Sequence, residues 1–120
     1  MMTKERRKFM RIATNLEAGY WAKGPSMNTG QGEVFNFSRE GVGIVLPADV
    51  EPGEHVDLTF KVPGDNIPIF ATTTVAWRYP SKKESRFGVG LRFHSIKPLD
   101  LARLLDFVYS QWLGGIRKNL

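Results

Sequence analysis

Two stretches of the chain alternate between apolar and polar residues, a pattern typical of β-strands that bury one face. In residues 67–79 the odd positions carry mostly apolar side chains, and in residues 86–94 the even positions carry arginine, glycine or histidine. A third alternating stretch covers residues 56–62 and ends at Pro63-Gly64. The sequence therefore predicts three strands, with a polar connection of hairpin length at residues 80–85.

Weaker strand patterns precede these three. They cover residues 16–23, 33–37 and 43–46. Turn-forming residues separate the pieces at Gly24-Pro25, Asn28 to Gly32, Pro47 and Pro52-Gly53. About six short strands without intervening helices favour an all-β fold, either an antiparallel barrel or a sandwich.

The end of the sequence has a different periodicity, with apolar residues at helical spacing. They are Leu101, Leu104, Leu105, Val108 and Trp112. Pro98 precedes them and Gly114-Gly115 supplies a stop signal, so the sequence predicts one amphipathic helix over residues 99–113. Packing of this helix on the β-structure is the favoured interpretation, and a dimerisation or partner surface is the alternative.

Length and composition exclude several classes of protein. The chain has 120 residues, of which 42% are hydrophobic and 24% charged, which suits one globular domain. It contains no cysteine, so disulfide frameworks and thiolate metal cages are excluded. No apolar run is long enough to span a membrane, and the charged N-terminus does not look like a secretory signal. We expect a cytoplasmic protein.

The positive charge of the chain is concentrated near its N-terminus. Residues 4–11 hold five of the 17 lysines and arginines and one of the 12 acidic residues, so they carry most of the net charge of +5. The rest of the chain is nearly neutral, unlike a protein whose whole surface coats nucleic acid. We expect a flexible basic arm that meets an anionic partner, and neither DNA nor RNA as that partner.

Candidates for catalysis are few. His55 and His94 fall on the polar sides of their strands, and neither has a further ligand at metal-binding spacing. The glycine pairs Gly41/Gly43 and Gly88/Gly90 lack the lysine and following helix of a phosphate-binding loop. The sequence therefore predicts a protein that is not an enzyme and holds neither a metal nor a cofactor.

The arm contains two arginines four residues apart, Arg7 and Arg11. In an extended segment such positions share a side and lie about 13 Å apart, at roughly 3.3 Å per residue. Guanidinium groups bind phosphate oxygens and the O6/N7 edge of guanine, so the pair could converge on one ligand. A solvated basic leader is the alternative interpretation.

A second candidate is the segment from Asn36 to Gly41, which lies between two predicted strands. Asn36 and Ser38 can close a turn and could offer oxygens to a purine, while Gly41 can adopt positive φ. A turn with no further role is the alternative. Trp77 falls with Val75 on the apolar side of its strand, which favours core packing over contact with a ligand.

Together the two motifs resemble the PilZ domain family. Its consensus pairs Arg-x-x-x-Arg with Asp/Asn-x-Ser-x-x-Gly, and this chain supplies Arg7/Arg11 and Asn36/Ser38/Gly41 in that order. The similarity continues through residues 75–77 and 88–93. It implies a six-stranded antiparallel β-barrel over residues 13–97, a basic arm over residues 1–12, a helix within residues 98–120, and no further domain.

The resemblance also implies a ligand, the bacterial second messenger cyclic di-GMP. In the family the arginines hold phosphate and guanine, and the turn surrounds a guanine; these roles fall here on Arg7, Arg11, Asn36, Ser38 and Gly41. Asn36 stands where many members have Asp, so it lacks the charge of a carboxylate. Arg6 precedes the motif, and we expect it to contact a second ligand molecule, which gives two per chain.

A receptor of this kind passes its signal to a downstream effector protein, which the sequence does not identify. We expect the arm to order around the ligand and so to carry the signal. Two alternatives remain open: a PilZ-like interaction module that works without the nucleotide, and a non-specific nucleic-acid binder that uses the basic arm.

Overall fold

Six strands and one helix make up the fold. A computed structural model describes residues 11–24, 28–80 and 86–118. The elements are β1 (Ile12–Ala22), β2 (Asn28–Ser38), β3 (Gly41–Leu46), β4 (His55–Phe60), β5 (Ile69–Pro80), β6 (Phe87–Ile96) and α1 (Pro98–Lys118).

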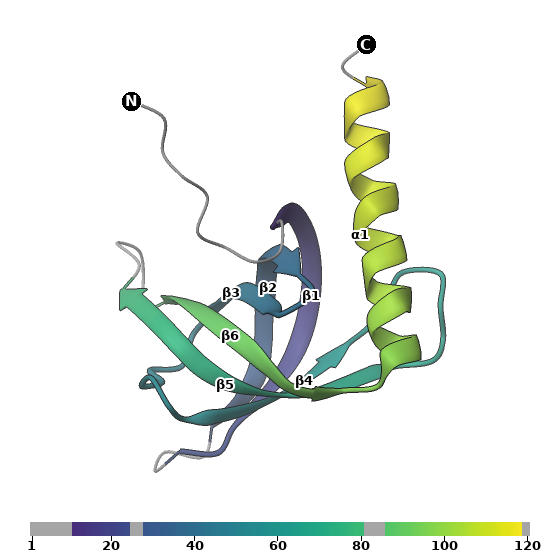
Figure 1. Cartoon of the computed structure of the whole chain (residues 1–120). Coiled ribbons are helices and arrows are strands. Elements are labelled where there is room, and N and C mark those ends of the chain that lie inside the picture. Colours follow the sequence, from purple (N-terminus) through teal and green to yellow (C-terminus); the bar gives the residue numbers. More distant parts are fainter. Residues whose placement is uncertain (1–10, 25–27, 81–85, 119–120) are drawn as a thin grey trace.

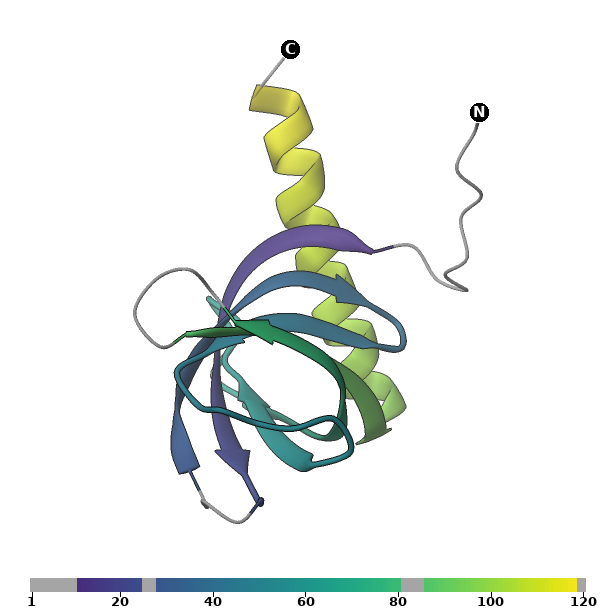
Figure 2. The same cartoon turned by 90° about the vertical axis from the view of Figure 1, so that its left-hand side faces the viewer.

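The strands close into a barrel in the order β1-β2-β3-β6-β5-β4, and every neighbouring pair is antiparallel. Figures 1 and 2 show the closed ring of strands, with α1 rising from one side of it. Closure removes the free sheet edges that a sandwich would have to protect. The predicted six-stranded antiparallel barrel with a C-terminal helix is confirmed.

Alternate residues of the strands fill the barrel interior with branched aliphatic and aromatic side chains. The largest fully buried ones are Phe37, Phe60, Ile44, Leu46, Leu58, Ile69, Leu104, Val34, Val50, Val56, Val89 and Val108. Two of these, Leu104 and Val108, come from α1, so the helix completes the core. Its predicted packing on the barrel is confirmed.

Several predicted boundaries differ from the structure, and the largest differences are at the start of β2 and the end of α1. Residues 28–32, expected to form a turn, belong to β2, where they pair with residues 18–22 of β1. The long ladder outweighs the local turn preference of these residues, and the Tyr20 hydroxyl adds a hydrogen bond of 2.9 Å to Asn28 Oδ1. The helix also continues through Gly114-Gly115 to Lys118, because glycine inside a helix costs only about 1 kcal/mol relative to alanine.

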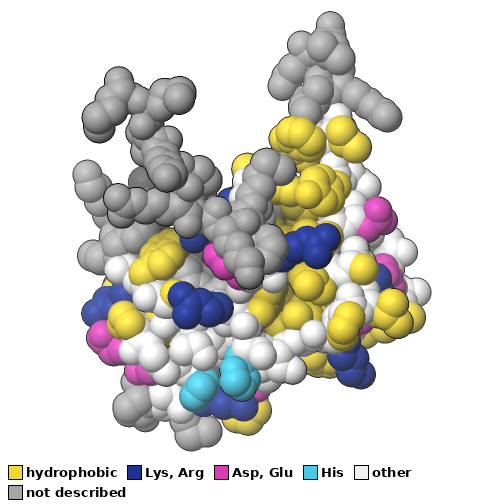
Figure 3. All heavy atoms as spheres, in the orientation of Figure 1, with side chains coloured by type: hydrophobic (Ala, Val, Ile, Leu, Met, Phe, Trp, Pro, Cys, Tyr) yellow, Lys and Arg dark blue, Asp and Glu magenta, His cyan; other side chains and the backbone are white. Residues whose placement is uncertain are grey.

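The carboxyl-terminal half of α1 stands clear of the barrel in both views (Figures 1 and 2). Its apolar side chains Tyr109, Trp112 and Leu113 are exposed, and Figure 3 shows hydrophobic groups along this part of the helix. The side chain of Gln111 ties this part of the helix to β1 by hydrogen bonds. Its Oε1 accepts from the Thr14 hydroxyl, and its Nε2 donates to the carbonyl oxygen of Asn15. In the described part of the chain no helix is long and apolar enough to cross a membrane.

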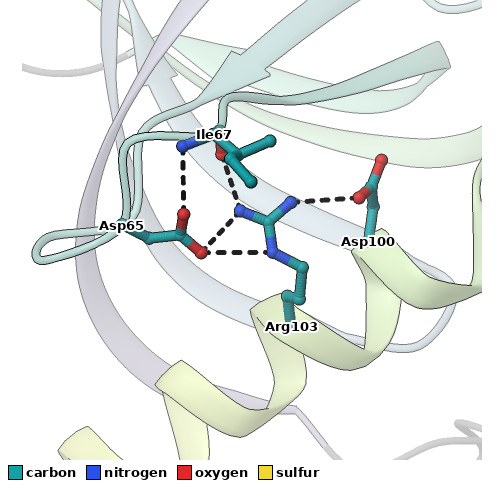
Figure 4. Close-up of polar contacts among 4 residues, drawn as sticks. All are labelled: Asp65, Ile67, Asp100 and Arg103. Atoms are coloured by element: carbon teal, nitrogen blue, oxygen red, sulfur yellow. Dashed lines mark hydrogen bonds and ion pairs between the residues drawn. The ribbon is translucent and has the colours of Figure 1, made fainter.

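A polar clamp fixes the first turns of α1 to the loop between β4 and β5 (Figure 4). Arg103 donates to Asp65 Oδ2 at 2.6 Å, to Asp100 Oδ1 at 3.1 Å and to the Ile67 carbonyl at 2.6 Å. The other Asp65 oxygen accepts the Ile67 N–H at 3.0 Å. Hydrogen bonds from the Ile67 N–H and then from Arg103 lower the pKa of Asp65.

We expect Asp65→Asn to lower the melting temperature by a few degrees at pH 7 and to have little effect near pH 2. A lowered folded-state pKa gives stability that is complete above the ordinary aspartate pKa of about 3.9 and is lost as the pH falls below it. Thermal denaturation followed by circular dichroism at both pH values measures the difference. The control Asp106→Asn changes an exposed residue of α1 that does not take part in the clamp, and this variant should melt like the parent.

Candidate functional site

The turn between β2 and β3 is closed by its own side chains. Ser38 pairs with Gly41 across the turn, and Ser38 Oγ accepts the backbone N–H of Glu40 at 3.2 Å. Asn36 Oδ1 accepts the N–H of Gly43 at 2.8 Å. The predicted turn is therefore present, and its asparagine and serine bond to nearby backbone as expected.

Gly41 is needed for space and not for an unusual backbone angle. Among the described glycines only Gly53 and Gly64 have positive φ, so Gly41 does not use the positive φ that glycine allows. A Cβ at this position would lie 2.0 Å from the carbonyl oxygen of Leu91 on β6. Only a residue without a side chain lets β3 approach β6 this closely.

The ladder places the turn beside residues that are distant in the sequence. One row of paired residues crosses four strands in the order β2, β3, β6 and β5. Its members are Asn36, Gly43, Gly90 and Trp77. A second row starts at Ser38 and crosses the same strands as Gly41, Arg92 and Thr74. Three glycines thus occupy the middle of the two rows.

Trp77 lies on the outside of the barrel, so the expectation that it packs in the core is wrong. The register of β5 and β6 shifts between Val75 and Trp77, and this bulge reverses the alternation of the strand. Val75 remains buried, whereas Trp77 is partly exposed and faces Gly90. A Cβ on Gly90 would lie 2.2 Å from the indole Nε1, so this glycine lets the ring lie over the backbone of β6.

These elements enclose a small depression of about 90 Å³, which we call the polar hollow. The residues that line it are Arg11, Asn36, Ser38, Glu40, Gly41, Val42, Gly43, Ala76, Trp77, Gly90, Leu91 and Arg92. Four strands and the residue before β1 contribute to it. The hollow is large enough for part of a nucleotide, and the rest of a larger ligand would lie on the surface above it.

Four of the predicted site residues meet in the polar hollow: Arg11, Asn36, Ser38 and Gly41. The predicted Arg6 and Arg7 lie outside the described residues. Sequence reasoning did not assign Glu40, Trp77 and Arg92 to the site. Arg92 could have been found from its place among the polar positions of residues 86–94, but Trp77 depends on a bulge that leaves no sequence signal.

Among the described residues, the charged groups that line the hollow are two arginines and one carboxylate. Arg11 comes from the segment before β1, Arg92 from β6, and Glu40 from the turn. Such a set can bind a phosphate through the guanidinium groups and a base through the turn. The arrangement suits a ligand that carries both groups.

The two histidines lie elsewhere on the surface. His55 and His94 are exposed, and their ring centroids are 6.5 Å apart in an edge-on arrangement (Figure 3). No group of three or more potential metal ligands occurs in residues 11–24, 28–80 and 86–118. Neither histidine lines the polar hollow.

Comparison with known protein families gives one match, to the PilZ domain, over residues 5–110. The chain belongs to the PilZ domain family. The match includes the segment of both predicted motifs and all six strands of the barrel. A comparison with curated proteins finds no relative by sequence.

Several solved structures share the fold. The PilZ domain of Escherichia coli YcgR with c-di-GMP has a TM-score of 0.67 and 16% identity, with 96% of this chain and 98% of that chain covered. Bacillus subtilis MotI/DgrA, an inhibitor of motility, has a TM-score of 0.73 and 19% identity, with coverages of 92% and 53%. The K. pneumonia MrkH–c-di-GMP complex has a TM-score of 0.69 and 13% identity, with 96% of this chain and 55% of that chain covered. This chain therefore spans about half of MotI and MrkH.

We expect Gly41→Ala to destabilise this PilZ domain by about 1–3 kcal/mol, because the new methyl group meets a backbone oxygen that cannot move without disturbing the ladder. Urea denaturation followed by circular dichroism measures the change. Gly19→Ala is the matched control, since its Cβ would meet its nearest neighbour, Gln31 Nε2, at an ordinary 3.5 Å. Its stability should stay within about 0.5 kcal/mol of the parent, and equal losses in both variants would contradict the role of Gly41.

Proposed function

We propose that this PilZ domain is a receptor for cyclic di-GMP and that the polar hollow is the centre of its binding site. The observation that carries the proposal is the meeting of Arg11 with Asn36 and Ser38 at one depression, although Arg11 precedes β1 and the other two residues lie at the end of β2. The ligand has two phosphates and two guanines. The hollow offers guanidinium groups for the first and a polar turn with an aromatic ring for the second.

The phosphates would bind the arginines. Arg11 and Arg92 line the hollow from different sides of the turn, and guanidinium–phosphate hydrogen bonds are charge-assisted and often bidentate. Arg7 precedes Arg11 in the sequence at the spacing of the family motif. We propose that Arg7 contacts the same ligand and that the arm closes over it.

One guanine would bind between the turn and Trp77. The Ser38 hydroxyl accepts from Glu40 N–H and keeps its own proton to donate, while the amide nitrogen of Asn36 makes no hydrogen bond to another described residue. The indole of Trp77 offers an aromatic surface, and stacking of a base on such a ring is worth about 1–3 kcal/mol. These groups together can hold and orient a purine.

The strength of binding is consistent with several contacts acting together. Micromolar affinity corresponds to about −8 kcal/mol, and each well-formed contact to a base or a phosphate supplies about 1–3 kcal/mol before ordering costs. One arginine alone cannot supply this. YcgR and MrkH, which share the fold, have been solved with c-di-GMP, and this supports the choice of ligand.

The receptor would work in the cytoplasm without catalysis, and it would act through another protein. Ligand binding would order the arm, and the changed arm or the barrel surface beside it would contact a downstream effector. The nearly neutral charge of the chain beyond residue 11 favours this function over non-specific binding of nucleic acid.

We expect Arg11→Ala, and separately Arg7→Ala, to weaken cyclic di-GMP binding at least tenfold, because each removes a charge-assisted contact while the barrel still folds. Isothermal titration calorimetry measures the affinity, and circular dichroism checks the fold. Lys61→Ala removes an exposed cation that does not line the hollow and should bind like the parent. Undiminished binding by both arginine variants would exclude this site.

A titration of the parent chain with a DNA oligonucleotide at two salt concentrations distinguishes the proposed receptor from a nucleic-acid binder. Binding that is sequence-independent and falls steeply with salt would favour the nucleic-acid binder.

We further expect two cyclic di-GMP molecules per chain at saturation, with the second held by Arg6 and stacked on the first. Arg6→Ala should reduce the stoichiometry from two to one and leave the first molecule bound. Calorimetry with a large excess of ligand measures this number. One ligand per chain for the parent at saturating concentration would refute the prediction.

A further inference from the structure

The hollow contains a carboxylate that the family motif does not assign to a role. Glu40 is the only acidic residue that lines the hollow within the described part of the chain. Its side chain makes no hydrogen bond or ion pair with any other described residue. Among the described residues, this carboxylate shares the hollow with Arg11 and Arg92 and forms no ion pair with them, so a ligand in the hollow could reach it.

The backbone of Glu40 is held on both sides. Its N–H donates to Ser38 Oγ at 3.2 Å, and its carbonyl oxygen accepts the N–H of Phe93 on β6 at 2.8 Å. The first bond closes the turn and the second ties the turn to the neighbouring strand. The side chain therefore starts from a fixed point at the edge of the hollow, which lowers the ordering cost of any contact that it makes.

The neighbouring acceptor is already engaged. Asn36 Oδ1 accepts the N–H of Gly43 at 2.8 Å, and as an amide oxygen it carries no full charge. The Watson–Crick edge of guanine presents two neighbouring donors, N1–H and N2–H, which a carboxylate can accept in pairs. Among the described lining residues Glu40 alone carries a carboxylate, so its charge and paired oxygens suit that edge.

We propose that Glu40 reads the guanine edge and sets the preference of this site for guanine over adenine. The inference rests on the proposed function and deepens it. Adenine presents an acceptor, N1, where guanine presents the N1–H donor, so the Glu40 carboxylate repels it. A site that accepts a hydrogen bond from a ligand N–H binds an analogue without that N–H much more weakly, because the acceptor is then left without a partner.

The test compares cyclic di-GMP with cyclic di-AMP by calorimetry on the full chain. The parent should bind cyclic di-GMP at least tenfold more tightly than cyclic di-AMP. Glu40→Gln keeps the shape of the side chain and removes its charge, so affinity for cyclic di-GMP should fall about tenfold while affinity for cyclic di-AMP does not fall. The preference should therefore decrease by about tenfold.

A carboxylate moved to the neighbouring position should rescue the loss. The double variant Glu40→Gln/Asn36→Asp places a charge at residue 36, and we expect it to recover most of the lost preference for cyclic di-GMP. Glu33→Gln is the matched control, because Glu33 is exposed on β2 and does not line the hollow. Glu40→Ala is a second variant without the carboxylate. Circular dichroism verifies the fold of each variant.

The outcomes separate the two proposals. If the parent chain does not bind cyclic di-GMP, the proposed function is wrong, and the role of Glu40 with it. If the parent binds but folded Glu40→Gln and Glu40→Ala keep the same preference for cyclic di-GMP over cyclic di-AMP, only the role of Glu40 is overturned.

Discussion

The site depends on the close approach of β3 and β6 at positions that carry no side chain. A Cβ on Gly41 would clash with the Leu91 carbonyl oxygen, and a Cβ on Gly90 would clash with the Trp77 indole. Gly43 leaves room for the side chain of Asn36. Side chains at these positions would push the turn away from β6. The glycines therefore determine whether the turn and the groups from β5 and β6 share one surface.

Irregularities in the ladder put Trp77 and Asn36 on that surface. The register shift between Val75 and Trp77 turns the indole ring of Trp77 outward. A second register shift, between Val34 and Asn36 in the pairing of β2 with β3, lies directly before Asn36. Bulges of this kind re-aim side chains without opening the sheet. The barrel keeps its core, because the residue before each register shift, Val34 on β2 and Val75 on β5, stays buried.

The turn residues serve the fold and the proposed site at the same time. Ser38 and Asn36 each bond to backbone, so they would be required for the shape of the turn even if no ligand bound. Arg11 and Glu40 are different, since their side chains line the hollow without a described hydrogen bond or ion pair to hold the barrel. The proposed binding role is therefore separate from the contacts that hold the turn at Arg11 and Glu40, whereas at Ser38 and Asn36 the same side chains serve both.

Local pattern was enough to predict six strands, the helix and the β2–β3 turn, because alternation and turn chemistry are properties of neighbouring residues. The two motifs also contain Arg11, Asn36, Ser38 and Gly41, which the fold brings together at the hollow. The outward position of Trp77 could not be derived in this way. It follows from the register shift in the pairing of β5 with β6, and pairing between distant strands is set by packing of the whole barrel and not by any one segment.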